Sequence, residues 1–144
     1  MLKKLFFLSF FTISVLFINA QEQQSFLYKG LIDRKMPVTL YLQAQQNGCG
    51  GDPFYMAMYK YDKVSKWLQL DISRSDKDEY AMVEYGFTGL MILKKEENTL
   101  KGTWISPDGK RQLPVFLKQE NINKKDSETY QNKLDEVNYE NHDC

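Results

Sequence analysis

Short apolar segments alternate with polar turns along most of this chain. Residues 38–44 read VTLYLQA, so that an apolar side chain occupies every second position. A period of two is typical of a strand with one buried face. Segments of the same kind recur between turn residues, and the pattern predicts about eight strands: residues 26–32, 38–44, 54–61, 68–72, 79–85, 87–93, 99–105 and 115–118.

The spacing of these segments predicts the fold class. Strands that recur at roughly 8–12-residue intervals are typical of a sandwich or a barrel. Short connections favour antiparallel pairing between neighbours in the sequence, and closure into a barrel leaves no exposed edge strand. We therefore predict an all-β domain over residues 21–119, built as a small up-and-down barrel or a strongly rolled meander rather than a Greek-key sandwich.

Two hairpins of the predicted barrel resemble each other. Lys29-Gly30 and Lys101-Gly102 are each followed by a turn and then by Arg-x-Met/Leu-Pro-Val-x-Leu, which begins at Arg34 in the first copy and at Arg111 in the second. Shared hairpin chemistry and a duplicated hairpin are both consistent with so short a match.

The first twenty residues have the pattern of a cleavable signal peptide. Lys3 and Lys4 precede an apolar run over residues 5–18, and Ala20 supplies the small residue at the cleavage position. A membrane anchor is the alternative, but the run is shorter than the roughly 20 residues of a spanning helix. Gln21 stands where a lipid-anchored protein needs cysteine. We expect a protein of the periplasm or the cell exterior, with no membrane span after cleavage.

Charge and composition separate the tail from the predicted barrel. Without Lys3 and Lys4 the chain holds seventeen basic and nineteen acidic residues, a formal net charge of −2 that indicates no nucleic-acid partner. Residues 120–144 form a polar tail with a formal charge of −4. Tyr130, Leu134 and Val137 follow helical spacing, which predicts a short helix over residues 127–139. Because this apolar stripe is thin, a disordered tail is the alternative.

Cys49 and Cys144 are the two cysteines of the chain. In an oxidising compartment such a pair predicts a disulfide, here between the glycine-rich loop at residues 47–53 and the end of the tail. Free or intermolecular thiols and a reactive cysteine are the alternatives. The single histidine, His142, is close to Cys144 in the sequence but lies in a segment without a predicted scaffold, which argues against a nucleophilic pair.

Aromatic residues gather around the third predicted strand and provide the best candidate binding site. Tyr55, Tyr59, Tyr61 and Trp67, with Tyr41 or Tyr80, predict either an aromatic face for a ligand or cross-strand packing inside the barrel. The sequence offers no catalytic set, metal site or cofactor motif. Asp76, Asp78 and Glu79 fit a solvated turn, and a hydrolase would have to use carboxylates such as Asp71 or Glu84.

Several short motifs, in this order, resemble a known group of proteins. They are YKG at residues 28–30, MPVTLYL at 36–42, YKYDK at 59–63, TG at 88–89, GTW at 102–104, PDGK at 107–110 and LPV at 113–115. Together they resemble an uncharacterised family of small secreted all-β proteins of Bacteroidota-type bacteria over residues 26–118. The resemblance implies export and an all-β fold, and it carries no catalytic residues across. The loop at Cys49 and the acidic tail depart from that family.

These observations predict an exported, non-catalytic binding module for a protein or a small ligand. The topology is also similar to lipocalin-like, avidin-like and lysozyme-inhibitor barrels, by analogy of fold only. A structural or interaction component of the cell envelope, with the tail docked on a partner or on the barrel, is the main alternative. A hydrolase of an envelope polymer is the third.

Overall fold

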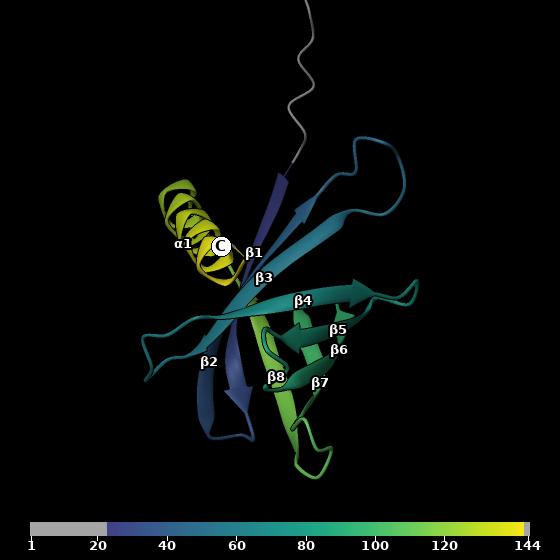
Figure 1. Ribbon diagram of the computed structural model, residues 1–144, viewed down its shortest axis with the longest axis vertical. Coiled ribbons are helices and arrows are strands. Elements are labelled where there is room, and N and C mark those ends of the chain that lie inside the picture. Colours follow the sequence, from purple (N-terminus) through teal and green to yellow (C-terminus); the bar gives the residue numbers. More distant parts are fainter. Residues whose placement is uncertain (1–22, 143–144) are drawn as a thin grey trace, which may run out of the picture.

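Eight strands and one helix make up the computed structural model, which describes residues 23–142 (Figure 1). The elements are β1 (Gln23–Ile32), β2 (Met36–Gln45), β3 (Phe54–Tyr61), β4 (Leu68–Arg74), β5 (Glu79–Glu84), β6 (Leu90–Glu96), β7 (Thr99–Ile105), β8 (Gln112–Glu120) and α1 (Lys124–His142). The strands form a closed barrel in chain order, and every neighbouring pair is antiparallel. The prediction of a small up-and-down β-barrel is therefore confirmed. The predicted signal peptide lies outside the described residues.

Pairing of the first strand with the last closes the barrel. β1 pairs with β8 from Leu27 opposite Glu120 to Ile32 opposite Val115. Each strand alternates between the interior and the outer surface, so the inward side chains form one core. This core consists of buried aliphatic and aromatic residues: Tyr28, Ile32, Val38, Leu40, Leu42, Ala57, Tyr59, Leu70, Tyr80, Met82, Met91, Leu93, Leu100, Trp104, Val115 and Leu117. An eight-stranded barrel encloses just enough space for such side chains.

Several strand boundaries differ from the prediction by one to three residues, and the starts of β6 and β8 are two of them. β6 begins at Leu90 rather than at residue 87, because Gly86 and Phe87 both adopt positive φ angles of 77° and 53°. The Phe87 N–H also donates to the Glu84 carbonyl at 2.7 Å, which makes a turn of this segment. β8 begins at Gln112 and contains Pro114, whose carbonyl oxygen accepts a hydrogen bond from the Asp33 N–H at 2.8 Å.

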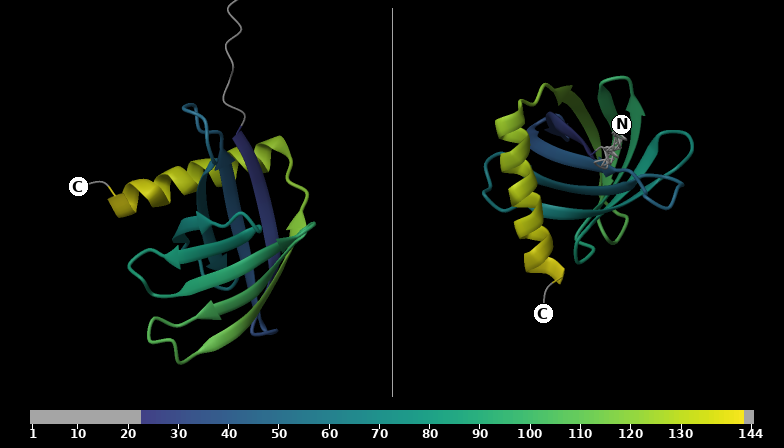
Figure 2. Two further views of the ribbon diagram at one scale, coloured as in Figure 1. Left: turned by 90° about the vertical axis from the view of Figure 1, so that its right-hand side faces the viewer. Right: turned by 90° about the horizontal axis from the view of Figure 1, so that it is seen from above.

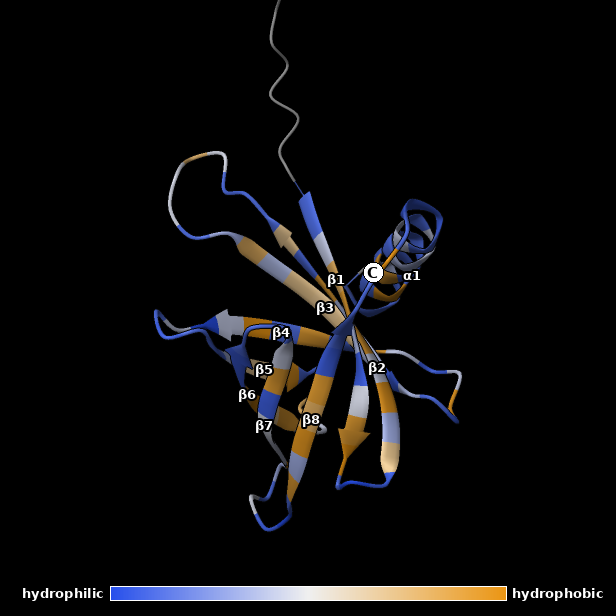
Figure 3. Ribbon diagram, turned by 180° about the vertical axis from the view of Figure 1, so that it is seen from behind, coloured by the Kyte–Doolittle hydropathy of each residue, from blue (hydrophilic) through white to orange (hydrophobic). Residues whose placement is uncertain are grey.

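The tail forms a helix that crosses the outer surface of the barrel (Figure 2). Asn123 caps it, since its side-chain oxygen accepts a hydrogen bond from the Asp126 N–H at 2.9 Å. The predicted helix is thus confirmed, and it is longer than predicted at both ends. Figure 3 shows α1 as mainly hydrophilic, in keeping with its thin apolar stripe. Within residues 23–142, no helix has the length and apolar character needed to cross a membrane.

A second, smaller core lies between α1 and the barrel. Leu134 and Val137 of α1 cluster with Tyr41 and Met58, which point outward from β2 and β3. Tyr130 adds a stacked contact with Tyr41, at 5.3 Å between ring centroids. The outer face of β2 is therefore buried as well, although its alternating pattern predicts a strand with one wet face. The helix supplies this cover, and the strand pattern alone does not indicate it.

The glycines of the two Lys-Gly motifs are required for the same structural reason. A Cβ atom on Gly30 would lie 2.0 Å from the Phe116 carbonyl oxygen, and one on Gly102 would lie 1.9 Å from the Ile92 carbonyl oxygen. Real Cβ atoms do not approach a backbone oxygen so closely, so both strands require glycine where the neighbouring strand comes near. Close backbone approach thus explains why both hairpins carry glycine at this place.

Candidate functional site

The seam between β3 and β4 is the weakest in the barrel wall. Within the described residues these strands pair at three positions, Ala57 with Leu70, Met58 with Gln69 and Tyr59 with Leu68. By contrast, β2 and β3 pair along eight positions. Residues 54–56 of β3 and residues 71–74 of β4 thus each have one edge that faces no paired strand. We refer to these two edges as the open seam.

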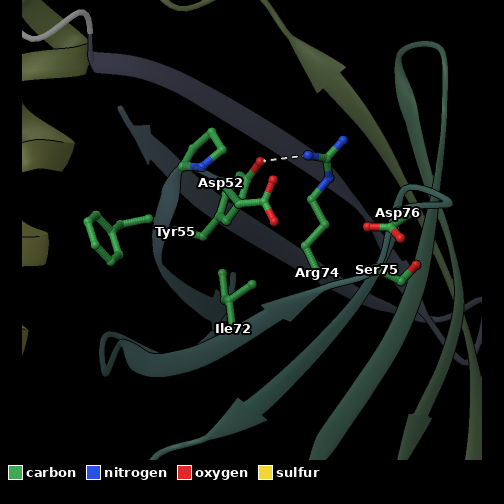
Figure 4. Close-up of a pocket in the computed structure, with 8 residues that line it drawn as sticks. Asp52, Tyr55, Ile72, Arg74, Ser75 and Asp76 are labelled. Atoms are coloured by element: carbon green, nitrogen blue, oxygen red, sulfur yellow. Dashed lines mark hydrogen bonds between the residues drawn. The ribbon is translucent and has the colours of Figure 1, made fainter. Parts of the chain in front are cut away.

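A cleft of about 430 Å³ lies at the open seam (Figure 4). Its lining comes from the start of β3, the end of β4 and the loops next to them: Asp52, Pro53, Phe54, Tyr55, Ile72, Arg74, Ser75 and Asp76. This volume falls in the range of small-ligand sites. The cleft combines aromatic and aliphatic surface with charged groups, as binding sites commonly do.

Arg74 is the central polar group of the cleft. Its Nη1 donates a hydrogen bond to the Tyr55 hydroxyl oxygen at 3.0 Å, and its Nη2 pairs with the Asp78 carboxylate. The guanidinium carbon also lies 5.8 Å from the ring centroids of both Tyr55 and Tyr80. Contacts of an arginine with aromatic faces are attractive because the ring face is electronegative. The side chain of Arg74 is therefore held in one position across the open seam.

Three groups at the cleft have shifted pKa values. The hydrogen bond to Asp78 raises the pKa of Arg74, and the Arg74 guanidinium holds the pKa of the Asp78 carboxyl below its ordinary value. Burial, and then the neighbouring Tyr55, raise the pKa of Tyr80. The arginine is thus charged and its positive charge is matched by Asp78. Asp52 and Asp76 also line the cleft, so its rim has an excess of negative charge.

A buried carboxyl group forms a second polar feature inside the barrel. Glu84 is 3% exposed, and its Oε1 accepts hydrogen bonds from the Tyr59 hydroxyl and from Trp104 Nε1, the latter at 2.7 Å. Its Oε2 accepts a hydrogen bond from the Thr88 hydroxyl at 2.6 Å. Burial, and then Glu84, raise the pKa of Tyr59. Through these hydrogen bonds, Glu84 on β5 connects to Tyr59 on β3 and to Trp104 on β7.

The four aromatic residues predicted as a binding site lie in different places. Tyr55 lines the cleft, whereas Tyr59 is 1% exposed in the barrel core. Tyr61 shares the inner face of β3 but lies at the other end of the barrel, next to Tyr59. Trp67 lies outside the wall, edge-on to Tyr130 of α1 at 5.9 Å. The structure therefore joins Tyr55 to Arg74 and Tyr80 rather than to the other three.

The sequence prediction missed Arg74 because it ended this strand at residue 72. β4 continues to Arg74, so the alternation of inward residues that begins at Leu68 extends to it. If this alternation is continued two residues beyond Ile72, it predicts that the Arg74 side chain lies on the inner side of the wall.

The carboxylates Asp71 and Glu84, which the hydrolase alternative needs, lie apart: Asp71 is exposed on β4, and Glu84 is enclosed by the barrel. The part of the chain described holds no cluster of three metal-ligating side chains.

The two cysteines are described only in part. Cys49 is exposed in the loop between β2 and β3, at the end of the barrel where β3 begins. Cys144 lies outside the described residues. The last residue of α1, His142, meets Tyr85 edge-on at 5.3 Å, and Tyr85 belongs to the turn between β5 and β6 at the opposite end. The predicted disulfide stays a prediction.

A scan against protein-family models finds no match, and searches of curated proteins and of solved structures find no similar protein. The resemblance to the Bacteroidota-type family therefore stays a prediction. The class of protein that the structure itself defines is an eight-stranded antiparallel barrel with a C-terminal helix packed on its wall.

Proposed function

We propose that this protein is an exported, non-catalytic binding module whose ligand site is the cleft at the open seam. One observation carries the proposal. The wall of the barrel is unpaired where Tyr55 and Arg74 meet, while the barrel interior is filled by core side chains. The ligand is a protein segment or a small molecule that lies against Tyr55 and Arg74.

The rigidity of the cleft supports binding. Arg74 is fixed by Tyr55 and Asp78, and Tyr80 meets Tyr55 edge-on at 5.7 Å. Side chains that are held before a ligand arrives lose little conformational entropy when it binds. A non-catalytic role is supported by the positions of the candidate carboxylates, since Asp71 and Glu84 lie on opposite sides of the wall and make no acid–base pair across a shared space.

Ligand titration with matched variants tests this proposal. Probes of three kinds (oligosaccharides, fatty acids and short peptides) are titrated into the protein lacking residues 1–20 and followed by NMR. We expect at least one probe to shift the amide signals of Tyr55 and Arg74. Tyr55→Phe should weaken that probe about tenfold, and Tyr139→Phe, a change at an exposed helix residue, should not. Shifts confined to other surfaces would refute the cleft as the site.

A specific observation also favours the alternative of an envelope interaction component. Leu31 and Phe116 lie directly opposite each other on β1 and β8 and are 40% and 50% exposed. Lys29 faces Lys118 in the same ladder, and like charges directly opposite one another are destabilising. An anionic partner would offset that cost. Phe116→Ser should then release the protein from envelope fractions, and unchanged fractionation would exclude this surface.

Deletion of the tail does not test that alternative cleanly. Removal of residues 120–144 would uncover Tyr41 and Met58, which are 0% exposed beneath α1. Loss of a complex after this deletion would then reflect damage to the barrel as much as a lost contact. Substitutions at the exposed Tyr139 of α1 probe the tail without this cost.

Mass spectrometry of protein exported by its host tests export and the disulfide together. Cleavage after Ala20 should give a chain that begins at Gln21. A disulfide makes that chain lighter by two hydrogen atoms, and an intermolecular bond doubles its mass until a reductant is added. An intact N-terminus at Met1 in the exported fraction would overturn the signal-peptide prediction.

A further inference from the structure

The backbone groups that face the open seam can be identified from their neighbours. In an antiparallel strand, the N–H and C=O groups of successive residues point alternately to the two flanking strands. The Asp62 N–H bonds to the Pro37 carbonyl at 2.9 Å, so even-numbered residues of β3 turn their backbone groups toward β2. The backbone groups of Tyr55 therefore point into the open seam.

The same reasoning applies to β4. The Gln69 carbonyl accepts a hydrogen bond from the Tyr85 N–H at 3.0 Å, so odd-numbered residues of β4 turn their backbone groups toward β5. Ser73, which lies opposite Ala81, belongs to this set. The backbone groups of Ile72 and Arg74 point the other way, into the open seam. Among the described residues no strand pairs with them there.

We propose that the cleft takes an extended peptide, which adds as a strand to the free edges of β3 and β4 at Tyr55, Ile72 and Arg74. This inference rests on the proposed function, since it assigns a ligand class to the same cleft. Unpaired strand edges are templates for a further strand. In strand addition, backbone hydrogen bonds supply affinity and pockets for alternate side chains supply specificity.

The lining of the cleft sets the chemistry of this peptide. Ile72, which packs against the inner core, offers apolar surface to every second side chain of an added strand. Asp52 and Asp76 line the cleft as well, while the charge of Arg74 is matched by Asp78. The excess of carboxylates favours a peptide with apolar residues at alternate positions and basic residues between them, and it disfavours an acidic one.

Selection from a peptide library, followed by amide hydrogen exchange, tests the inference. The probes are seven-residue peptides in which valine or threonine alternates with a randomised position, selected on the protein lacking residues 1–20. We expect the selected peptides to be basic and to slow exchange of the Tyr55, Ile72 and Arg74 amides by about tenfold or more. N-methylation of alternate peptide nitrogens should abolish binding, because it removes donors to the seam.

A pair of proline variants separates the two edges of β4. Ile72→Pro removes an N–H that faces the open seam, so the barrel should stay folded while peptide binding is lost. Ile72→Ala controls for the side chain and should keep measurable binding. Ser73→Pro removes an N–H that faces β5 and should instead destabilise the barrel. If Ile72→Pro does not fold, the N-methylated peptides still decide the question.

Failure of this inference differs from failure of the proposed function. A sugar or fatty acid that shifts Tyr55 and Arg74, with no peptide that protects their amides, would leave the cleft as a site and overturn strand addition. Peptides that bind equally well when N-methylated would also overturn it. Peptides that protect amides on another surface, with no probe of any kind at the cleft, would overturn both.

Discussion

The Tyr55 hydroxyl oxygen accepts a hydrogen bond from Arg74 Nη1 at 3.0 Å, across a part of the wall where the described residues of β3 and β4 do not pair. This side-chain contact joins two strands whose backbones have separated. It fixes the position of the guanidinium at the cleft, and it links the residue that the sequence predicted, Tyr55, to one that the sequence did not.

Tyr55→Phe should leave the barrel stable and loosen the cleft. The bond lies at the surface, so the free energy of unfolding should fall by about 1 kcal/mol or less. Exchange of the Arg74 guanidinium protons should become faster, because one partner is lost. Urea denaturation and NMR measure the two effects. A loss of several kcal/mol would mean that Tyr55 carries the fold rather than the site.

Glu84→Ala should strongly destabilise the protein, and Glu84→Gln should do so much less. Alanine leaves the buried donors of Tyr59 and Trp104 without their acceptor, at a cost of about 3 kcal/mol. Glutamine keeps one oxygen for these donors and places an amide near the Thr88 hydroxyl. The difference between the two variants in urea denaturation is the measurement. Equal losses would show that the charge, rather than the acceptor geometry, matters at this position.

Gly30→Ala and Gly102→Ala should have matching effects. Each new methyl group would meet a backbone carbonyl oxygen at about 2 Å, so the strand must shift away from its neighbour. We expect a loss of about 2 kcal/mol or more for each, as for other overpacked sites. Ser73→Ala, an exposed change on β4, is the control. Thermal or urea unfolding that shows either glycine variant as stable as the control would contradict the close approach.

Leu134→Ala should weaken the attachment of α1 to the barrel. Leu134 is 1% exposed against Tyr41 and Met58, and removal of a buried leucine side chain costs about 2–4 kcal/mol. Tyr139→Ala, which changes a residue 67% exposed on the same helix, should cost little. Hydrogen exchange of α1 amides, measured beside urea denaturation, shows whether the helix separates first. Equal effects of both variants would contradict the packing.

Alkaline pH should destabilise the barrel through its buried tyrosines. Burial, and then Tyr80, raise the pKa of Tyr28 from 10.0 to about 12. Below pH 10 both folded and unfolded forms keep the proton, so this group leaves stability unchanged there. Between pH 10 and 12 the unfolded chain loses the proton first, and stability falls as pH rises. Tyr28→Phe should flatten this fall in urea denaturation at pH 10–12; an unchanged slope would contradict the shifted pKa.

The sequence by itself determined the local order of this protein. A period of two along residues such as Val38, Leu40 and Leu42 assigns each side chain to one face of its strand, because successive residues of a strand point to opposite sides. Short polar turns then force neighbouring strands to pair antiparallel. Strand number, strand order and the barrel class follow from these two rules, and the structure confirms them.

Only the tertiary structure decided which side chains meet. The contacts of Arg74 with Tyr55 and of Glu84 with Trp104 join residues from different strands, so they depend on register, twist and the place where pairing stops. Alternation within one strand fixes none of these. The cover that α1 gives to Tyr41 is likewise a contact between distant segments. The candidate site therefore came from the packing of the barrel, whereas the barrel itself came from the pattern of the chain.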